Sequence, residues 1–293
     1  MFNKIFLFEI KYRLHRPAVY LYFLACLGFT FLSFAIGAMP LDEKQLINGT
    51  SSLAFYVSIM SMMMMLVSSY IMGVPLYRDI EFNTKEYYLS YPITKAGYFW
   101  GRYLSSFLFV VIIDSTVLLG AYLGCKAGPS VGWLGAAHYG PNHLINYIHP
   151  FLTIAVPNLF FTSSLFFGLV AITRNVKVIY SSGILLFLGY MIANFFINSS
   201  SSATVIYLAD PFAVNAIKYE RGLQTIAEKN NSLTNIHGLF LLNRIIWTGV
   251  GAFILIYTSL SFSFLRSGIL SRKIPPKCCE AMAEKKRSLT NSK

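Results

Sequence analysis

A single acidic side chain, Asp114, interrupts one of the long apolar stretches of the sequence. A charge at the centre of a bilayer costs about 2.5–3.5 kcal/mol on insertion scales, and such residues mark proton or cation paths. Asp114 could therefore sense a proton or cation, or line a path. Alternatively, a protonated Asp114 forms a hydrogen bond with Ser115, Thr116 or another helix and has a structural role. The residue types leave both interpretations open.

The other potentially reactive residues do not assemble into a convincing catalytic pattern. Residues 128–132 read GPSVG and match G-x-S-x-G, but they follow an apolar span instead of a strand and have no acidic neighbour for a triad. His138, His143 and His149 lie in a segment without acidic residues, which favours a solvated loop over a metal site. The P-loop and H-E-x-x-H patterns are both absent. We therefore expect no enzyme activity and no cofactor, with energy supplied by a partner or an ion gradient.

The composition places these residues in a membrane. The 293 residues are 55% hydrophobic and only 12% charged, whereas soluble domains carry about 25% charged residues. The apolar blocks are long enough for a hydrocarbon core of about 30 Å. We predict an all-α integral membrane protein, with one six-span domain over residues 1–265 and a basic tail over residues 266–293. The spans are predicted at about residues 18–39, 53–76, 103–124, 151–173, 178–198 and 245–265.

The basic residues predict the orientation of these spans. With a cytoplasmic N-terminus, the cytoplasmic segments hold 18 of the 24 Lys and Arg residues and the external segments hold six. Such an excess is typical of cytoplasmic loops. The net charge of +12 therefore reflects topology, and we expect no nucleic-acid partner. Both termini are predicted to be cytoplasmic.

The first 16 residues are predicted to form an amphipathic helix that lies on membrane lipid. At about 100° per residue, Phe6, Leu7, Ile10 and Leu14 fall on one arc. Lysine residues fall on another arc, as in helices that bind the bilayer interface.

The loop at residues 77–102 carries the strongest interaction signal. Aromatic side chains dominate protein interfaces, and charged side chains orient partners, so this loop could dock into another protein. An interfacial helix with an aromatic belt explains the same residues equally well. The residues concerned are Asp79, Glu81, Glu86, Tyr87, Tyr88, Tyr91 and Pro92.

A second helix signal lies between the fifth and sixth predicted spans. Asp210 can cap a helix and Pro211 suits its first position. This pair predicts a helix over residues 211–228 that ends near Asn230 and Asn231.

The loop from Arg78 to Arg102 resembles the region between the second and third spans of ABC-2 type exporter permeases. That family has an acidic turn, a short coupling helix, a small-x-Pro-Ile/Leu-Ser/Thr step and an aromatic-x-x-Gly-Arg/Lys pattern where the third span starts. Asp79 and residues 81–89, 90–94 and 98–102 match these parts in order. The six spans and the amphipathic N-terminal helix fit the same family.

Residues 208–247 are similar to a narrower group of bacterial permeases. Their first half carries a DPF, an EKN and an NR-hydrophobic-W element, which here fall at residues 210–212, 228–230 and 243–247. Some of those chains are fused to a gluzincin-type aminopeptidase domain. This sequence covers one six-span unit and has no zinc motif, so the resemblance implies no peptidase activity.

The resemblance implies a permease subunit of an ATP-binding-cassette exporter in a bacterial inner membrane. Two six-span units, identical or different, would form the transmembrane part. Residues 79–92 would dock into a cytosolic ABC ATPase subunit, which binds the ATP, and residues 210–228 would form external helices. The substrate is not indicated. Two alternatives remain: a gradient-driven secondary transporter that uses Asp114, and a membrane scaffold that transports nothing.

Overall fold

The structure, a computed structural model, describes residues 2–38, 44–82, 93–131, 136–173, 175–198 and 202–262. For residues 80, 81, 176 and 179 it describes the backbone alone. Every regular element in these ranges is a helix. The residues up to Phe262 form one compact unit.

The first half of this unit consists of a short helix followed by three long ones. They are α1 (Phe2–Leu14), α2 (Pro17–Ile36), α3 (Thr50–Glu81) and α5 (Lys95–Val131). The second half contains three further long helices, α7, α8 and α12, and several short ones. They are η1 (Ala136–His138), α6 (Ile145–Pro150), η2 (Phe151–Ala155), α7 (Val156–Thr173), α8 (Val176–Asn198), α9 (Ala203–Leu208), α10 (Val214–Leu223), α11 (Ile226–Asn231) and α12 (Gly238–Ser261).

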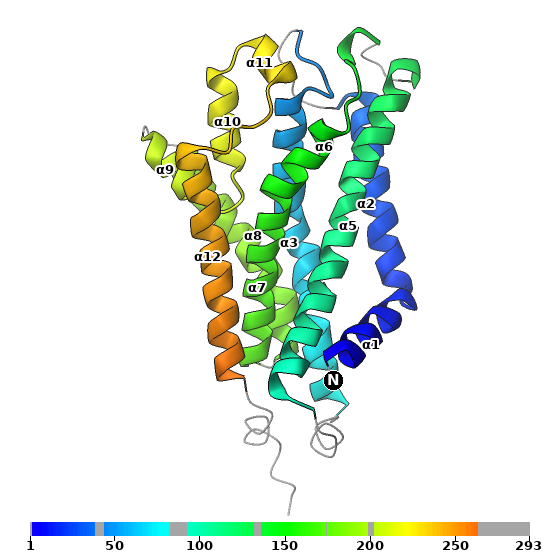
Figure 1. The fold of residues 1–293 in the computed structure, drawn as a ribbon, viewed down its shortest axis with the longest axis vertical. Coiled ribbons are helices and arrows are strands. Elements are labelled where there is room, and N and C mark those ends of the chain that lie inside the picture. The colour runs from blue at the N-terminus through cyan, green and yellow to red at the C-terminus, as the bar shows by residue number, and fades with distance from the viewer. Residues whose placement is uncertain are drawn as a thin grey trace, which may run out of the picture. The chain divides into compact units, whose positions relative to one another are not determined.

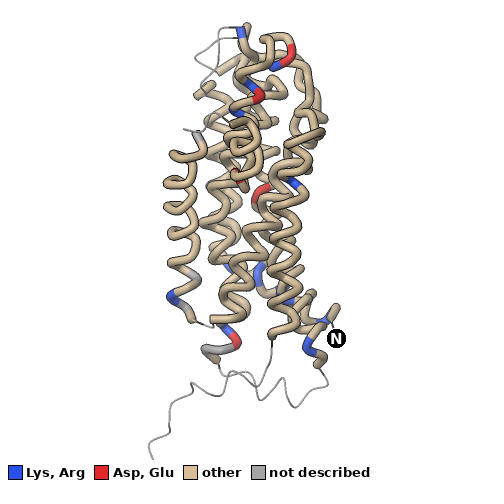
Figure 2. Tube along the Cα trace, turned by 90° about the vertical axis from the view of Figure 1, so that its left-hand side faces the viewer, with Lys and Arg blue, Asp and Glu red and all other residues tan. Residues whose placement is uncertain are grey.

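Six helices of the described residues are long and apolar enough to cross a membrane, as the sequence predicts. Figure 1 shows the long helices side by side, with α9, α10 and α11 at one end of the unit and α1 crossing the other end. Figure 2 shows most of the charged residues near these two ends. The arrangement fits a multi-pass membrane protein.

Two of the spanning helices are longer than the sequence predicts. Helix α3 has 32 residues and α5 has 37 residues, which correspond to about 48 Å and about 55 Å at 1.5 Å per residue. Both lengths exceed a hydrocarbon core of about 30 Å. Their ends therefore project beyond the lipid, where charged side chains can be hydrated or paired.

The polar and small residues of α3, α5 and α7 lie in the centre of the unit. More than half of the apolar window of each of these three spans is buried, against less than a third for α2, α8 and α12. The outer helices instead expose large apolar side chains, including Leu24 on α2, Phe195 on α8 and Leu260 on α12. Lipid contact explains this exposure, because it would be unfavourable over such an area in water.

A pair of glycines brings α2 and α5 close together. A Cβ atom on Gly120 would lie 2.7 Å from the carbonyl oxygen of Leu27, and one on Gly124 would lie 2.7 Å from that of Phe31. Small residues four positions apart allow this backbone approach in membrane helices. The two glycines therefore allow the backbones of α2 and α5 to approach closely at this point.

The fourth span contains a π-helix between α6 and α7. The backbone N–H of Val156 bonds to the carbonyl of Phe151, five residues earlier, and Pro150 precedes this turn. Pro157 lies just beyond this irregular turn. Wide turns of this kind often mark functional positions in helices.

Candidate functional site

The densest group of buried charges lies where α1 meets the end of α3 and the start of α5. This charge cluster comprises Glu9, Arg13, Arg78, Asp79 and Arg102. Three guanidinium groups thus face two carboxylates. Both ends of the loop at residues 77–102 supply members of the cluster, and α1 supplies the others.

Glu9 lies at the centre of the charge cluster. Its side chain is fully buried, with 0% of its surface exposed. Its Oε1 atom contacts Arg78 and Arg102, and its Oε2 atom lies 3.7 Å from Nε of Arg13, one helical turn further along α1. One carboxylate therefore connects three helices.

Asp79 connects α3 to the first turns of α5. Its Oδ2 atom accepts a hydrogen bond from Nη2 of Arg102 at 2.6 Å, and another from the hydroxyl of Tyr98. Arg102 is 2% exposed and bridges Asp79 to Glu9. The two ends of the loop at residues 77–102 are thereby held together by buried, charge-assisted bonds, which are stronger than neutral ones.

Arg13 extends the cluster towards the middle of the unit. Its Nη2 atom donates to the carbonyl of Ile71 at 3.0 Å and to Oγ of Ser106 at 2.6 Å, and its guanidinium lies over the ring of Phe109. Burial, together with the nearby charge of Arg78, lowers the pKa of Arg13 to about 9. Arg13 therefore remains charged at pH 7.

Glycine and aromatic residues at the start of α5 form the surface on which α1 packs. A Cβ atom on Gly101 would come within 3.1 Å of the Ile5 side chain, so a larger residue at this position would crowd the crossing of α1 over α5. The pattern at residues 98–102 is thus explained residue by residue: Tyr98 bonds Asp79, Gly101 admits α1, and Arg102 bonds Glu9.

Of the seven loop residues singled out from the sequence, the structure describes the side chain of Asp79 alone. Asp79 is buried and faces Tyr98 and Arg102 within the protein. Glu81 ends α3, and its side chain lies outside the described residues. The predicted partner-binding residues Glu86, Tyr87, Tyr88, Tyr91 and Pro92 also lie outside the described residues.

Two members of the charge cluster were missed by the sequence analysis. The helical arc that was expected to face lipid omitted Glu9 and Arg13, which turn out to be the buried residues of α1. Their spacing of four residues was the available signal, because such a pair lies on one helix face. Leu7 and Leu14, on the predicted lipid arc, are exposed.

A second polar network surrounds Asp210, between α9 and α10. Asp210 Oδ1 accepts from the backbone N–H of Phe212 at 2.9 Å, and Oδ2 accepts from that of Asn215 at 2.6 Å. The hydroxyl of Tyr190 donates to the same carboxylate at 3.1 Å. Burial raises the pKa of Asp210, against these hydrogen bonds.

The NR-hydrophobic-W residues of α12 add further hydrogen bonds to this network. Asn243 donates to the carbonyl of Asp210 at 2.8 Å, and Trp247 Nε1 donates to that of Leu208 at 3.1 Å. Arg244 Nη1 donates to Oδ1 of Asn158 on α7 at 2.7 Å. The DPF and NR-hydrophobic-W elements are therefore neighbours in space, and their polar atoms satisfy backbone groups between helices.

The helix predicted over residues 211–228 is instead two helices, α10 and α11. Ala213 has a φ of 58°, so α10 begins only at Val214, although Asp210 still accepts a hydrogen bond from the N–H of Asn215 in its first turn. Pro211 therefore precedes the helix and does not occupy its first position. Thr225 and Glu228 then form a capping box that starts α11.

Asp114 is buried inside α5, with 1% of its surface exposed. Its Oδ1 atom has no hydrogen-bond partner among the described residues. Ser115 and Thr116 donate to the carbonyls of Ile112 and Ile113 of their own helix, each at 2.7 Å. Neither hydroxyl therefore donates to Asp114 in this structure.

The described residues contain no group of three or more His, Cys, Asp or Glu side chains that could hold a metal ion. Comparisons of the chain with protein-family models, curated proteins and solved structures give no match. The resemblance to exporter permeases therefore rests on the sequence motifs.

Proposed function

We propose that this chain is a permease subunit of an ATP-binding-cassette exporter. Residues 79–92 are its coupling segment, which docks into a cleft of a cytosolic ABC ATPase subunit. A second six-span unit, identical or different, completes the transmembrane part in a bacterial inner membrane. Both termini are cytoplasmic, in line with the excess of basic residues in the segments assigned to that side.

The observation that carries this proposal is the charge cluster at the base of the coupling segment. Asp79 precedes the outer part of the segment and Arg102 follows it, and their side chains are bonded to each other. Glu9 joins this pair to α1. A displacement of the segment by a partner would therefore reach α1, α3 and α5 together, because separating buried ion pairs is costly.

Helix α5 would then transmit the movement from the charge cluster to the other spans. Beyond Arg102, this helix continues to Gly120 and Gly124, where α2 packs closely against it. The same helix thus connects the charge cluster with the lipid-exposed α2. A movement that begins at the coupling segment can in this way change how the spans of two units meet.

Purification of the tagged full chain from its native membranes tests the proposal. We expect a P-loop ATPase to co-purify and its ATP hydrolysis to depend on the permease. Replacing Tyr87, Tyr88 and Pro92 together by alanine should reduce the bound ATPase at least tenfold. Tyr219→Ala is the matched control, because Tyr219 is a partly exposed tyrosine on α10, at the opposite end of the unit from α1 (Figure 1).

Two outcomes would refute the coupling assignment. One is a complex with no P-loop ATPase among its proteins. The other is unchanged ATPase binding in the triple variant. A bound partner without any ATP hydrolysis would favour the scaffold alternative.

Asp114 supports a second candidate, gradient-driven transport. A buried carboxylate with an unpartnered oxygen is the kind of group that takes up a proton or cation in membrane proteins. Proton uptake into proteoliposomes that contain the full chain alone, measured with a pH-sensitive dye, would favour this candidate. The uptake should then be lost in Asp114→Asn and kept in Ser115→Ala.

A further inference from the structure

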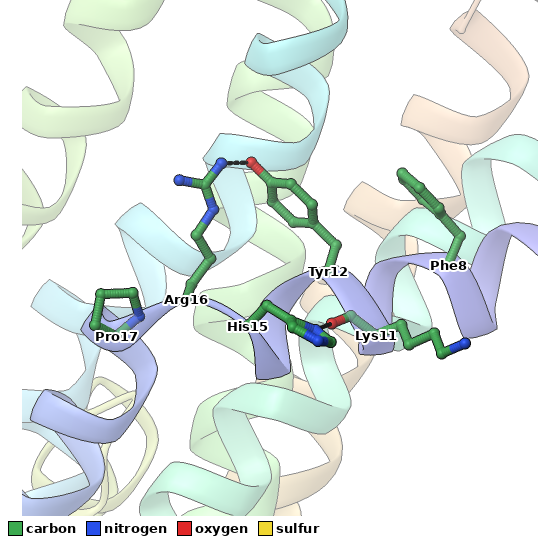
Figure 3. A pocket seen from close by; sticks show the side chains of 6 residues that line it. All are labelled: Phe8, Lys11, Tyr12, His15, Arg16 and Pro17. Carbon is green, nitrogen blue, oxygen red and sulfur yellow. Dashed lines mark hydrogen bonds between the residues drawn. The ribbon is translucent and has the colours of Figure 1, made fainter.

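A basic groove lies at the elbow between α1 and α2. It has a volume of about 490 Å³ and is lined by Phe8, Lys11, Tyr12, His15, Arg16 and Pro17. Figure 3 shows Arg16 and Tyr12 reaching over one side of α1, joined by a hydrogen bond, with His15 beside them. Lys11 and Arg16 both line the groove where α1 meets α2, and their charged ends extend in different directions in this view.

The elbow is held in a defined conformation by its backbone. Arg16 is extended, with φ −96° and ψ 120°, as expected for a residue that precedes proline. Pro17 then starts α2. The hydroxyl of Tyr20 donates to the carbonyl of Leu14 at 2.8 Å, which ties the first turn of α2 to the end of α1. The groove is thus a preformed feature.

The positive charge of the groove is not cancelled by the nearest carboxylate. Glu9 is buried on another face of α1, where it pairs with three arginines of the charge cluster. Lys11 Nζ makes no ion pair or hydrogen bond within the described residues. The guanidinium of Arg16 stacks 4.5 Å from the centre of the Tyr12 ring, which orients it while leaving it exposed.

The groove continues into an apolar track along α2. Pro17 lines the groove, and Leu21 and Leu24 follow on the same helix face, since positions three and four apart are neighbours on a helix. Leu21 is 66% exposed and Leu24 is 64% exposed. A ligand that fits both parts has an anionic head and a long apolar chain.

We propose that the groove binds the headgroup phosphate of an anionic phospholipid, with Lys11 and Arg16 as the binding cations. One acyl chain of this lipid lies along Leu21 and Leu24. Arginine and lysine are suited to phosphate, and clustered basic residues beside a membrane span attract anionic lipid headgroups. A bound lipid would also hold α1 in place beside the charge cluster.

The test compares lipid binding by two variants that lose the same number of charges. Detergent-purified full chain is titrated with phosphatidylglycerol or phosphatidylcholine, and bound lipid is counted by native mass spectrometry. The test variant carries Lys11→Gln and Arg16→Gln. The control variant carries Lys126→Gln and Lys218→Gln, at two exposed lysines outside the groove.

We expect the test variant to bind phosphatidylglycerol about thirtyfold more weakly than the natural chain. This factor corresponds to about 1 kcal/mol for each cation near an anionic surface, at 1.4 kcal/mol per factor of ten. The control variant should keep its affinity, and binding of phosphatidylcholine should not change. Lys11→Gln alone should lower the affinity for phosphatidylglycerol about fivefold, and this substitution leaves the Arg16–Tyr12 contact intact.

Three results would overturn the proposal. The first is equal phosphatidylglycerol binding by the natural chain and the test variant. The second is an equal loss in the control variant, which would show that the effect is one of net charge. The third is competition by millimolar inorganic phosphate as strong as that by lipid, which would identify a site for a soluble anion.

Discussion

Glu9→Gln is the change that most directly probes the charge cluster. The substitution keeps the size of the side chain but removes the negative charge that faces Arg13, Arg78 and Arg102. Arg102 retains Asp79, and Arg13 retains two hydrogen bonds. The substitution therefore removes the largest share of electrostatic attraction from Arg78.

The magnitude follows from the burial of the pairs. Arg78 also lies 4.1 Å from the centre of the Tyr12 ring, which offsets part of its lost attraction. Two unit charges 4 Å apart attract by about 4 kcal/mol at an effective dielectric constant of about 20. Removing one partner of a buried ion pair costs about 3–5 kcal/mol, because the other charge stays buried without compensation. We expect Glu9→Gln to destabilise the protein by this amount.

Thermal unfolding of the detergent-purified protein, followed by tryptophan fluorescence, measures the effect. Lys4→Gln is the matched control, since it removes one exposed charge from the same helix. The control should unfold at the temperature of the natural chain, and Glu9→Gln several degrees lower. A second substitution, Arg78→Gln, should lower the unfolding temperature less when it is added to Glu9→Gln than when it is made alone. Equal unfolding temperatures for Glu9→Gln and the natural chain would refute the assignment of Glu9 as the centre of the cluster.

Three further predictions concern other parts of the fold. Gly124→Leu should destabilise the protein by about 1–3 kcal/mol in thermal unfolding, because its Cβ would lie 2.7 Å from the carbonyl of Phe31. The Thr225 hydrogen bonds lower the pKa of Glu228, so their contribution is present above the ordinary carboxyl pKa and is lost as pH falls through the lowered value. The hydrogen-exchange protection factors of the α11 amides, which are corrected for the intrinsic pH dependence of exchange, should fall over that interval, but not in Glu228→Gln. Asp114→Asn should leave the unfolding temperature unchanged or raise it, because it replaces a buried carboxyl whose Oδ1 lacks a partner.

Each of these predictions has a contrary result. Gly189→Leu is the control for Gly124, because nothing lies within 4 Å of a Cβ atom on Gly189. Equal stability losses in the two leucine variants would contradict the close approach of α2 and α5. Protection factors of the α11 amides that do not change with pH would contradict the role of Glu228. A marked fall in unfolding temperature for Asp114→Asn would show that the carboxyl has a stabilising partner.

The sequence by itself determined the number and approximate places of the six spans. Apolar blocks of sufficient length are a local property, and a bilayer requires every spanning backbone to satisfy its own hydrogen bonds as a helix. The lengths of α3 and α5 were not determined in this way. Their ends continue past the apolar blocks because other helices pair with their charged residues, as Glu9 does with Arg78 and Arg102.

The meaning of the motifs, in contrast, depended on tertiary structure. Asp210 was predicted as a helix cap from its type, and it does bond the N–H of Asn215. Its contacts with Tyr190 and Asn243 come from segments distant in the sequence, which no local pattern predicts. The positive φ of Ala213, which divides the predicted helix, likewise belongs to the packed structure.

The clearest difference lies in α1. By sequence, one arc of apolar residues was assigned to lipid and the lysines to another arc, and Glu9 and Arg13 were assigned to neither, because periodicity reports only which residues share a face. Only the folded chain decides what covers each face. Here Glu9 and Arg13 turn inward because α3 and α5 supply complementary charges and Gly101 leaves room for the helix to approach.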